Sequence, residues 1–107
     1  MIGFIALLRY DNRIPSLKGA YAERNTAEIV KCYVDASVRR NGIGSELVKA
    51  ALALAARAGY EVLYLHTHRF LPGAVSFWRR QGFEIRLETG DELQTVHLDR
   101  YVQDKHP

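Results

Sequence analysis

The sequence predicts a single α/β domain with a mixed, mostly antiparallel sheet and helices packed on both of its faces. Two observations lead to this prediction. Strand-forming apolar runs alternate with two segments of helical periodicity, and 107 residues suit one hydrophobic core rather than two. The composition, 48% hydrophobic and 25% charged, is typical of a globular protein and excludes disordered, collagen-like and disulfide-rich classes. We therefore treat residues 1–107 as one domain.

The first half of the chain holds two clear strands and one helix. Ile2 to Leu8 is an apolar run that ends at a polar turn, and Thr26 to Val34 is rich in strand formers, so both predict strands. Lys18 to Glu23 is only an uncertain extended piece. Ser45 to Ala58 consists of strong helix formers with apolar residues at helical spacing, and Gly59 then supplies the stop.

The second half adds a strand, a helix and a closing pair of strands. Val62 to Leu65 predicts a short strand, which should run parallel to Thr26 to Val34 because a helix connects the two in a right-handed crossover. Pro72 to Gln81 predicts an amphipathic helix. Phe83 to Glu88 and Thr95 to Val102 predict an antiparallel pair, so the sheet as a whole is mixed.

Charge and cysteine content narrow the functional classes. Fifteen Lys and Arg against twelve Asp and Glu give a net charge of +3, which suits an anionic ligand. The sequence contains no recognisable nucleic-acid-binding motif and no aromatic stacking surface, so this charge does not predict nucleic-acid binding. The single cysteine, Cys32, cannot form an internal disulfide, so we expect a reducing cytoplasmic location. The run Ile2 to Leu8 is too short to span a bilayer, so no membrane partner is expected.

The most informative motif, RRNGIGS, begins at Arg39 and lies between the second predicted strand and the first helix. A helix N-terminus presents unpaired backbone N–H groups and a partial positive charge, and Gly42 and Gly44 let the backbone approach a ligand closely. With its two arginines, the segment therefore predicts an anion site. The alternative is a tight turn in which the glycines relieve strain and Ser45 caps the helix.

Three motifs together resemble the GNAT superfamily of acyl-CoA N-acyltransferases. RxxGxG at residues 39–44 looks like the family signature Q/R-x-x-G-x-G/A. AEIV at residues 27–30, with Cys32, resembles the central strand of histone acetyltransferase members. AVSFWRRQGF at residues 74–83 is similar to the family's A-x-x-x-Y-x-x-x-G-F helix. The motifs occur in family order, so the chain looks like an N-terminally shortened GNAT-like domain.

The resemblance implies that acetyl-CoA is the co-substrate and that its acetyl group passes directly to an amine acceptor of unknown size. The pyrophosphate would lie on the backbone amides of Arg39, Arg40, Asn41, Gly42, Ile43, Gly44 and Ser45. The pantetheine arm would pair with the strand backbone at Cys32, Tyr33 and Val34. In the family this strand and the next parallel strand splay apart, and free backbone N–H groups in the gap stabilise the developing oxyanion.

Glu28 is the candidate catalytic base. Strand alternation predicts that it shares a face with Val30, Cys32 and Val34, so a carboxylate among apolar neighbours would be desolvated and favoured as a proton acceptor. It also matches the glutamate with which resembling histone acetyltransferases deprotonate the acceptor amine. The alternative is an exposed carboxylate at a strand end, and both interpretations stay open.

Two substitutions depart from the family pattern. Trp78 stands where the family usually has a tyrosine thought to protonate the leaving thiolate, and an indole cannot donate that proton at neutral pH. Tyr33, Tyr64 or solvent would then supply it. Leu71 replaces an asparagine that contacts pantetheine in many members. The alternative function is therefore an acyl-CoA-binding module without turnover, which regulates or senses through a partner.

The predicted sheet begins at what would be the family's second strand, at Ile2. An edge strand and an apolar face that the family normally covers would then be exposed, so we expect a homodimer related by a two-fold axis. The alternative is that the segment from Arg9 to Glu23 folds back over this edge.

His66 and His68 form an H-x-H pattern that raises the question of a metal site. No third ligand lies within reach in the sequence, so we expect no metal and instead histidines that line the acceptor cleft or are solvated. His97 and His106 add nothing local to this pattern. Cys32 is a weak candidate nucleophile, because a small buried thiol without an adjacent base is the commoner situation.

Overall fold

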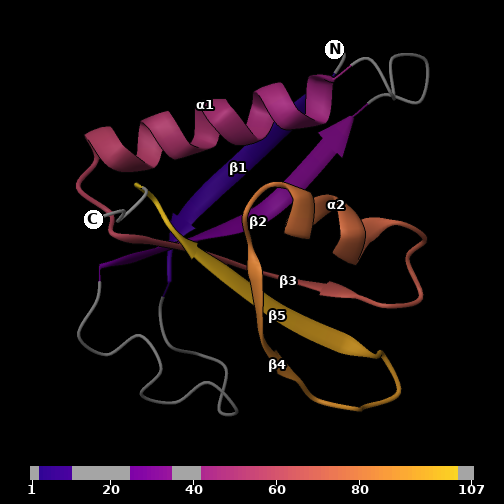
Figure 1. Cartoon of the computed structure of the whole chain (residues 1–107). Helices are drawn as coiled ribbons and strands as arrows, with labels where there is room; N and C mark the ends of the chain where they lie inside the picture. Colours follow the sequence, from indigo (N-terminus) through magenta and orange to yellow (C-terminus); the bar gives the residue numbers. More distant parts are fainter. Residues whose placement is uncertain (1–2, 11–24, 35–41, 104–107) are drawn as a thin grey trace.

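A computed structural model describes residues 3–10, 25–34 and 42–103, which form a five-stranded sheet and two helices (Figure 1). The elements are β1 (Gly3–Arg9), β2 (Thr26–Val34), α1 (Ile43–Arg57), β3 (Val62–His68), α2 (Ala74–Arg80), β4 (Glu84–Glu88) and β5 (Thr95–Tyr101). The uncertain piece Lys18 to Glu23 lies outside the described residues.

The sheet has the order β1-β2-β3-β5-β4 and is mostly antiparallel. Among the described strands, β2 and β3 are the parallel pair, and α1 connects them, as a crossover between parallel strands requires. The pairs β1 with β2, β3 with β5 and β4 with β5 are antiparallel. The predicted fold class, an α/β domain with a mixed sheet, is therefore confirmed.

Both described helices pack on one face of the sheet, which we call the helix-covered face. Val48 and Ala55 of α1 and Trp78 of α2 belong to one buried cluster, to which β3 contributes Leu63 and Leu65. Figure 1 shows both helices above the sheet. In this detail the structure differs from the predicted placement on both faces. The two helical connections, from β2 to β3 and from β3 past β5 to β4, advance across the sheet in the same direction, so a common handedness places both helices on one side.

The opposite face, which we call the polar face, carries side chains of a different kind. Tyr64 and His66 alternate with the apolar residues of β3 and point to this face. Directly paired residues share a face, so Glu28 of β2 and His97 and Asp99 of β5 lie beside them. Glu28, His97 and Asp99 are all buried, at 1%, 3% and 6% exposure. Neither α1 nor α2 covers these groups.

Two of the boundaries that differ from prediction have a reason that the structure shows. Helix α1 begins at Ile43 rather than Ser45, because Gly42 adopts a left-handed φ of 78° that turns the chain into the helix. Strand β3 extends to His68 rather than Leu65, since β5 pairs with it along its whole length. Neither described helix has the length and apolar character that a membrane span requires.

Candidate functional site

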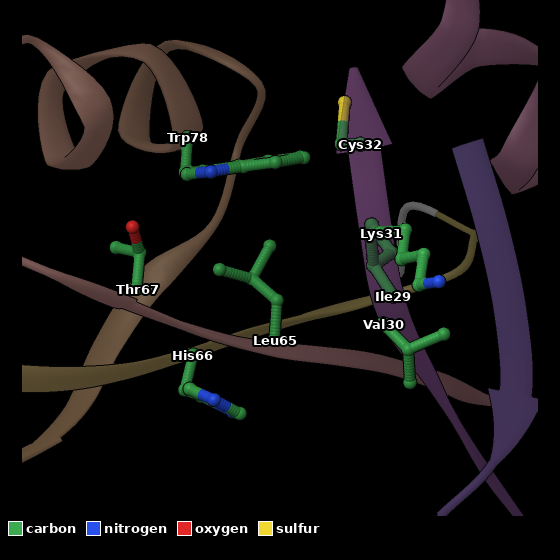
Figure 2. Close-up of a pocket in the computed structure, with 8 residues that line it drawn as sticks. All are labelled: Ile29, Val30, Lys31, Cys32, Leu65, His66, Thr67 and Trp78. Atoms are coloured by element: carbon green, nitrogen blue, oxygen red, sulfur yellow. The ribbon is translucent and has the colours of Figure 1, made fainter. Parts of the chain in front are cut away.

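Strands β2 and β3 separate after a short paired stretch. Their register runs only from Thr26 with Val62 to Glu28 with Tyr64, although both strands continue beyond it. Figure 1 shows the two strands diverging toward their C-terminal ends. The resulting gap holds a pocket of about 150 Å³ (Figure 2). Its described lining residues are Ile29, Val30, Lys31, Cys32, Leu65, His66, Thr67 and Trp78.

The backbone of β2 is open toward this gap. Cys32, Tyr33 and Val34, the residues expected to hold the pantetheine arm, belong to the part of β2 that pairs with β1. On the other side, the register of β2 with β3 does not reach them. A strand that is paired on one side only presents hydrogen-bonding backbone groups on the other. The described backbone therefore suits an extended, amide-containing ligand in the gap.

A β-bulge in β2 sets the direction of the side chains along the gap. Ala6 of β1 pairs with Lys31. The next β1 residue, Leu7, pairs with Ile29, so Val30 is an extra residue in β2. Because side chains alternate with a period of two residues, one extra residue reverses the alternation beyond it.

The bulge overturns the expected placement of Glu28. Strict alternation predicted that Glu28 shares a face with Cys32, but the extra residue turns Cys32 to the helix-covered face. Figure 2 shows Cys32 and Trp78 above the β3 strand, and His66 and Val30 below it. Glu28 points to the polar face and is 1% exposed. The alternative interpretation of Glu28 as an exposed carboxylate is therefore also wrong.

Glu28 belongs to a group of polar side chains on the polar face. Its Oε2 atom lies 3.7 Å from Nδ1 of His66. His66 is paired with His97 of β5, and the two ring centroids are 6.1 Å apart. Nδ1 of His97 is in turn hydrogen bonded to the Tyr64 hydroxyl at 2.7 Å. His97 is distant from His66 in the sequence, and the register of β5 on β3 brings it opposite His66.

His97 is held in its neutral form. Burial lowers the pKa of His97, and the neighbouring His66 and His68 lower it further, although Asp91 opposes this effect. In a neutral ring that carries its proton on Nε2, Nδ1 is an acceptor, so the Tyr64 hydroxyl donates to it. The pair therefore satisfies two buried polar groups without placing a charge on the polar face.

Cys32 and Trp78 line the pocket on the helix-covered face of the sheet. We expected a buried thiol at Cys32, but the residue is exposed. The groups packed around its sulfur nevertheless raise the pKa of the thiol by desolvation. A thiol that stays protonated is a poor nucleophile. The Trp78 ring makes edge contacts with Phe77 and Phe83, at centroid distances of 5.0 and 5.4 Å. Trp78 therefore forms a fixed aromatic wall.

The start of α1 has the features of an anion site. The first helix hydrogen bond runs from the Glu46 N–H to the Gly42 carbonyl at 3.0 Å, so the N–H groups of Ile43, Gly44 and Ser45 precede it. No side chain caps the helix at Gly42. A Cβ at Gly42 would meet nothing within 4 Å, so space is open at this point. These N–H groups can therefore contact an anionic group directly.

Ser45 does not cap α1. Its hydroxyl oxygen accepts a hydrogen bond from the Gln81 side chain at 3.0 Å, which ties α1 to the end of α2. In the alternative interpretation of the motif as a tight turn, the Ser45 cap is therefore wrong, whereas Gly42 does adopt the left-handed conformation that such a turn requires. Arg39, Arg40 and Asn41, the other residues expected to contact the pyrophosphate, lie outside the described residues.

The histidines of the H-x-H pattern have different surroundings. His66 lines the pocket, whereas His68 stacks on Phe70 and lies 3.4 Å from the Thr95 hydroxyl. In the part of the chain that the structure describes, no cluster of three or more His, Cys, Asp or Glu side chains could hold a metal ion.

Comparison with known proteins agrees with this geometry. The family model described as the Acetyltransferase (GNAT) family matches residues 1–83. The chain belongs to the GNAT acetyltransferase family. An uncharacterized N-acetyltransferase of Methanocaldococcus jannaschii is 36% identical over 62 residues, which make up 58% of this chain and 27% of that protein. The chain thus matches only about a quarter of this curated relative.

Solved structures share the fold of this GNAT chain. Ard1 from Thermoplasma volcanium has 24% sequence identity and a TM-score of 0.75, over 96% of this chain and 64% of that one. The Bacillus subtilis acetyltransferase, solved in complex with CoA, has 22% identity and a TM-score of 0.71, over 94% of this chain and 69% of that one. At these identities the similarity establishes the fold.

Proposed function

We propose that this GNAT chain is an N-acetyltransferase that passes the acetyl group of acetyl-CoA directly to an amine. The observation that carries the proposal is the gap between β2 and β3. The aromatic ring of Trp78, the open backbone of β2 and the imidazole of His66 surround it, and the carboxylate of Glu28 lies 3.7 Å from that imidazole. A group-transfer enzyme needs a surface that holds the donor and a group that removes a proton from the acceptor.

The residues at the start of α1 and along β2 fit acetyl-CoA. Ile43, Gly44 and Ser45 offer backbone N–H groups to the pyrophosphate, and the helix dipole adds a partial positive charge there. Arg39, Arg40 and Asn41 complete this contact in our proposal. The amides of the pantetheine arm pair with the open backbone of β2 at Cys32, Tyr33 and Val34. The CoA complex of the Bacillus subtilis relative supports this assignment.

The transfer involves one attack and one departure. The amine nitrogen forms a bond to the thioester carbonyl carbon, and backbone N–H groups of β2 stabilise the oxyanion. The carbon–sulfur bond then breaks. The proton lost by the amine goes to the pair formed by Glu28 and His66. Water protonates the departing CoA thiolate, since Trp78 has no acidic proton, and the protonated Cys32 takes no part.

Binding is tested with a matched pair of glycine variants. Acetyl-CoA at a hundredfold excess over its dissociation constant should add about 2.7 kcal/mol, a melting shift on the order of ten degrees. Gly42→Asp should abolish this shift, because it places a negative charge where the pyrophosphate lies. Gly90→Asp is the control. Gly90 has a positive φ of 68°, compared with 78° at Gly42, and a Cβ added at either glycine would meet nothing within 4 Å. No shift with the wild-type protein contradicts the proposal.

Turnover is tested by CoA thiol release with a panel of small amines, peptide N-termini and lysine side chains. Release that depends on the amine is the expected result. The competing function is an acyl-CoA-binding module without turnover, which the position of Trp78 in the pocket wall favours. A melting shift without thiol release for any amine would establish that alternative and refute the transferase.

We further propose that the chain is cytoplasmic, on the ground of its single cysteine, and that a second copy covers β1. Strand β1 lies at the sheet edge, and its Phe4 and Leu8 side chains are exposed, at 38% and 61%. Leu8→Lys should dissociate the dimer, whereas Leu54→Lys, at a 51% exposed position of α1, should not. In a sedimentation experiment, a 12.2 kDa species that still binds acetyl-CoA would show that binding does not need the dimer.

A further inference from the structure

The polar face separates a group that a substrate can reach from one that it cannot. His66 lines the pocket, and its side chain is 38% exposed. Glu28 is 1% exposed and is not among the described lining residues. The carboxylate lies behind the imidazole, 3.7 Å from its Nδ1 atom. An amine that enters the pocket therefore meets the ring of His66 before it meets the carboxylate of Glu28.

We propose that His66 takes the proton from the acceptor amine and that Glu28 is the positioning residue that orients the ring. This inference rests on the proposed transferase function. Because Nδ1 of His66 faces Glu28, its other nitrogen, Nε2, lies on the side of the ring away from the carboxylate. A nucleophile, a base and a group that orients the base are the usual parts of such a site. Here the acceptor amine is the nucleophile.

The groups around His66 favour this role. Glu28 of β2 stabilises the imidazolium that forms when the ring accepts a proton. On the same strand, Tyr64 and His68 lie at ring distances of 6.4 and 6.0 Å. His68 opposes the charge on His66 when it is itself protonated. His97 of β5 is kept neutral by its burial, so it adds no positive charge of its own.

The next charged groups on this face neutralise each other. Asp99 of β5 accepts two hydrogen bonds from the guanidinium of Arg86, at 2.9 and 3.2 Å. Asp99 is therefore already paired with Arg86, and the carboxylate that lies 3.7 Å from the His66 ring is that of Glu28.

The proton has a complete path. Nε2 of His66 takes it as the amine nitrogen bonds to the acetyl carbon and the carbon–sulfur bond breaks. The imidazolium then passes the proton to water, because the His66 ring is exposed at the pocket, and the CoA thiolate takes a proton from water. Glu28 keeps its charge throughout, so the positive charge on the ring is balanced while it lasts.

The first test replaces the imidazole with a side chain that cannot take a proton. His66→Gln should lower kcat/KM by roughly 10²- to 10⁴-fold with an amine that the wild-type enzyme acetylates. The acetyl-CoA dissociation constant should be unchanged, as read from the fluorescence of Trp78, the single tryptophan of the chain and a pocket residue. His68→Gln is the matched control, since His68 lies two residues further along the same strand but does not line the pocket, and it should keep its activity.

The pH profile distinguishes the base from the positioning residue. His66→Gln should abolish the acidic limb of kcat/KM, whereas Glu28→Gln should keep that limb and move it to lower pH, because the imidazolium loses its carboxylate. The NMR titration of the His66 ring should move to lower pH in Glu28→Gln as well, and this readout does not depend on turnover. The reverse pattern, in which Glu28→Gln loses the limb and His66→Gln keeps it, would overturn the proposal.

Failure of this inference differs from failure of the proposed function. A wild-type protein that binds acetyl-CoA but acetylates no amine refutes the transferase and the role of His66 with it. A wild-type enzyme that acetylates an amine, with His66→Gln equally active, refutes the role of His66 alone.

Discussion

The two sides of the β2–β3 gap are built from the same strands and serve different purposes. On the helix-covered face, Leu63 and Leu65 of β3 pack with Trp78 in the buried cluster. On the polar face, the residues that alternate with them, Tyr64 and His66, contact His97 and a carboxylate. Strand alternation thus separates, by a single residue position, the packed side from the side to which we assign proton transfer in our proposal. Substitutions at neighbouring positions of β3 should therefore have different kinds of effect.

The largest effect on stability is expected on the helix-covered face. Leu63 is fully buried, so Leu63→Ala should lower the free energy of unfolding by about 2–5 kcal/mol, through lost burial and the cavity left behind. Urea denaturation measures this. Leu54→Ala, at a 51% exposed position, should change it by less than about 0.5 kcal/mol. Equal effects of the two variants would contradict the assignment of the core to this face.

The adjacent position on the polar face should give a smaller loss. Tyr64→Phe removes the hydroxyl that is hydrogen bonded to Nδ1 of His97 and leaves that buried atom without this partner, which should cost about 1–3 kcal/mol. The same urea experiment checks it, with Tyr60→Phe as a tyrosine control away from this face. A Tyr64→Phe protein as stable as the wild type would show that the hydrogen bond contributes nothing to folding.

The polar face should also make stability depend on pH. Because burial lowers the pKa of His97 below its ordinary value of 6.5, the unfolded chain binds a proton there more readily than the folded chain. The contribution of neutral His97 is therefore complete above its unfolded pKa and declines as the pH falls below 6.5 toward the folded pKa, with a slope of at most about 1.4 kcal/mol per pH unit. Urea denaturation between pH 7.5 and 5.5 measures this slope, which His97→Gln should reduce.

The smallest effect is expected at Cys32, on the helix-covered side of the gap. Since desolvation raises the pKa of its thiol, we expect the thiol to be a poor nucleophile, and Cys32→Ala should lower kcat by less than roughly tenfold. Single-turnover acetyl transfer to an amine checks this. A complete loss of transfer, with acetyl-CoA binding retained, would indicate an acyl-enzyme on Cys32 and contradict direct transfer.

Much of the fold was predictable because the relevant signals are local. The strand Thr26–Val34 has the predicted bounds, since its strand-forming residues are adjacent in the sequence. The helical spacing of Ser45 to Ala58 likewise predicts the body of α1, although Gly42 starts the helix earlier. The family motifs were equally accessible, and the match over residues 1–83 confirms the family that they indicated.

The candidate site was only partly predictable. The glycine motif indicated the start of α1, but nothing in its residue types showed that the Ser45 hydroxyl would bond to Gln81 instead of capping the helix. The H-x-H pattern pointed to His66 without distinguishing it from His68. Only the pocket, which includes His66 and leaves out His68, makes that distinction.

The sequence by itself determined the secondary structure, the family and the residues from which a site could be built, because periodicity and motif spacing are properties of neighbouring residues. The tertiary structure decided which of those residues meet. The extra residue Val30 turns Cys32 and Glu28 to opposite faces, and the register of β5 on β3 brings His97 opposite His66. A shift of one residue in either pairing reverses which face a side chain occupies, and such a shift depends on contacts between strands that are distant in the sequence.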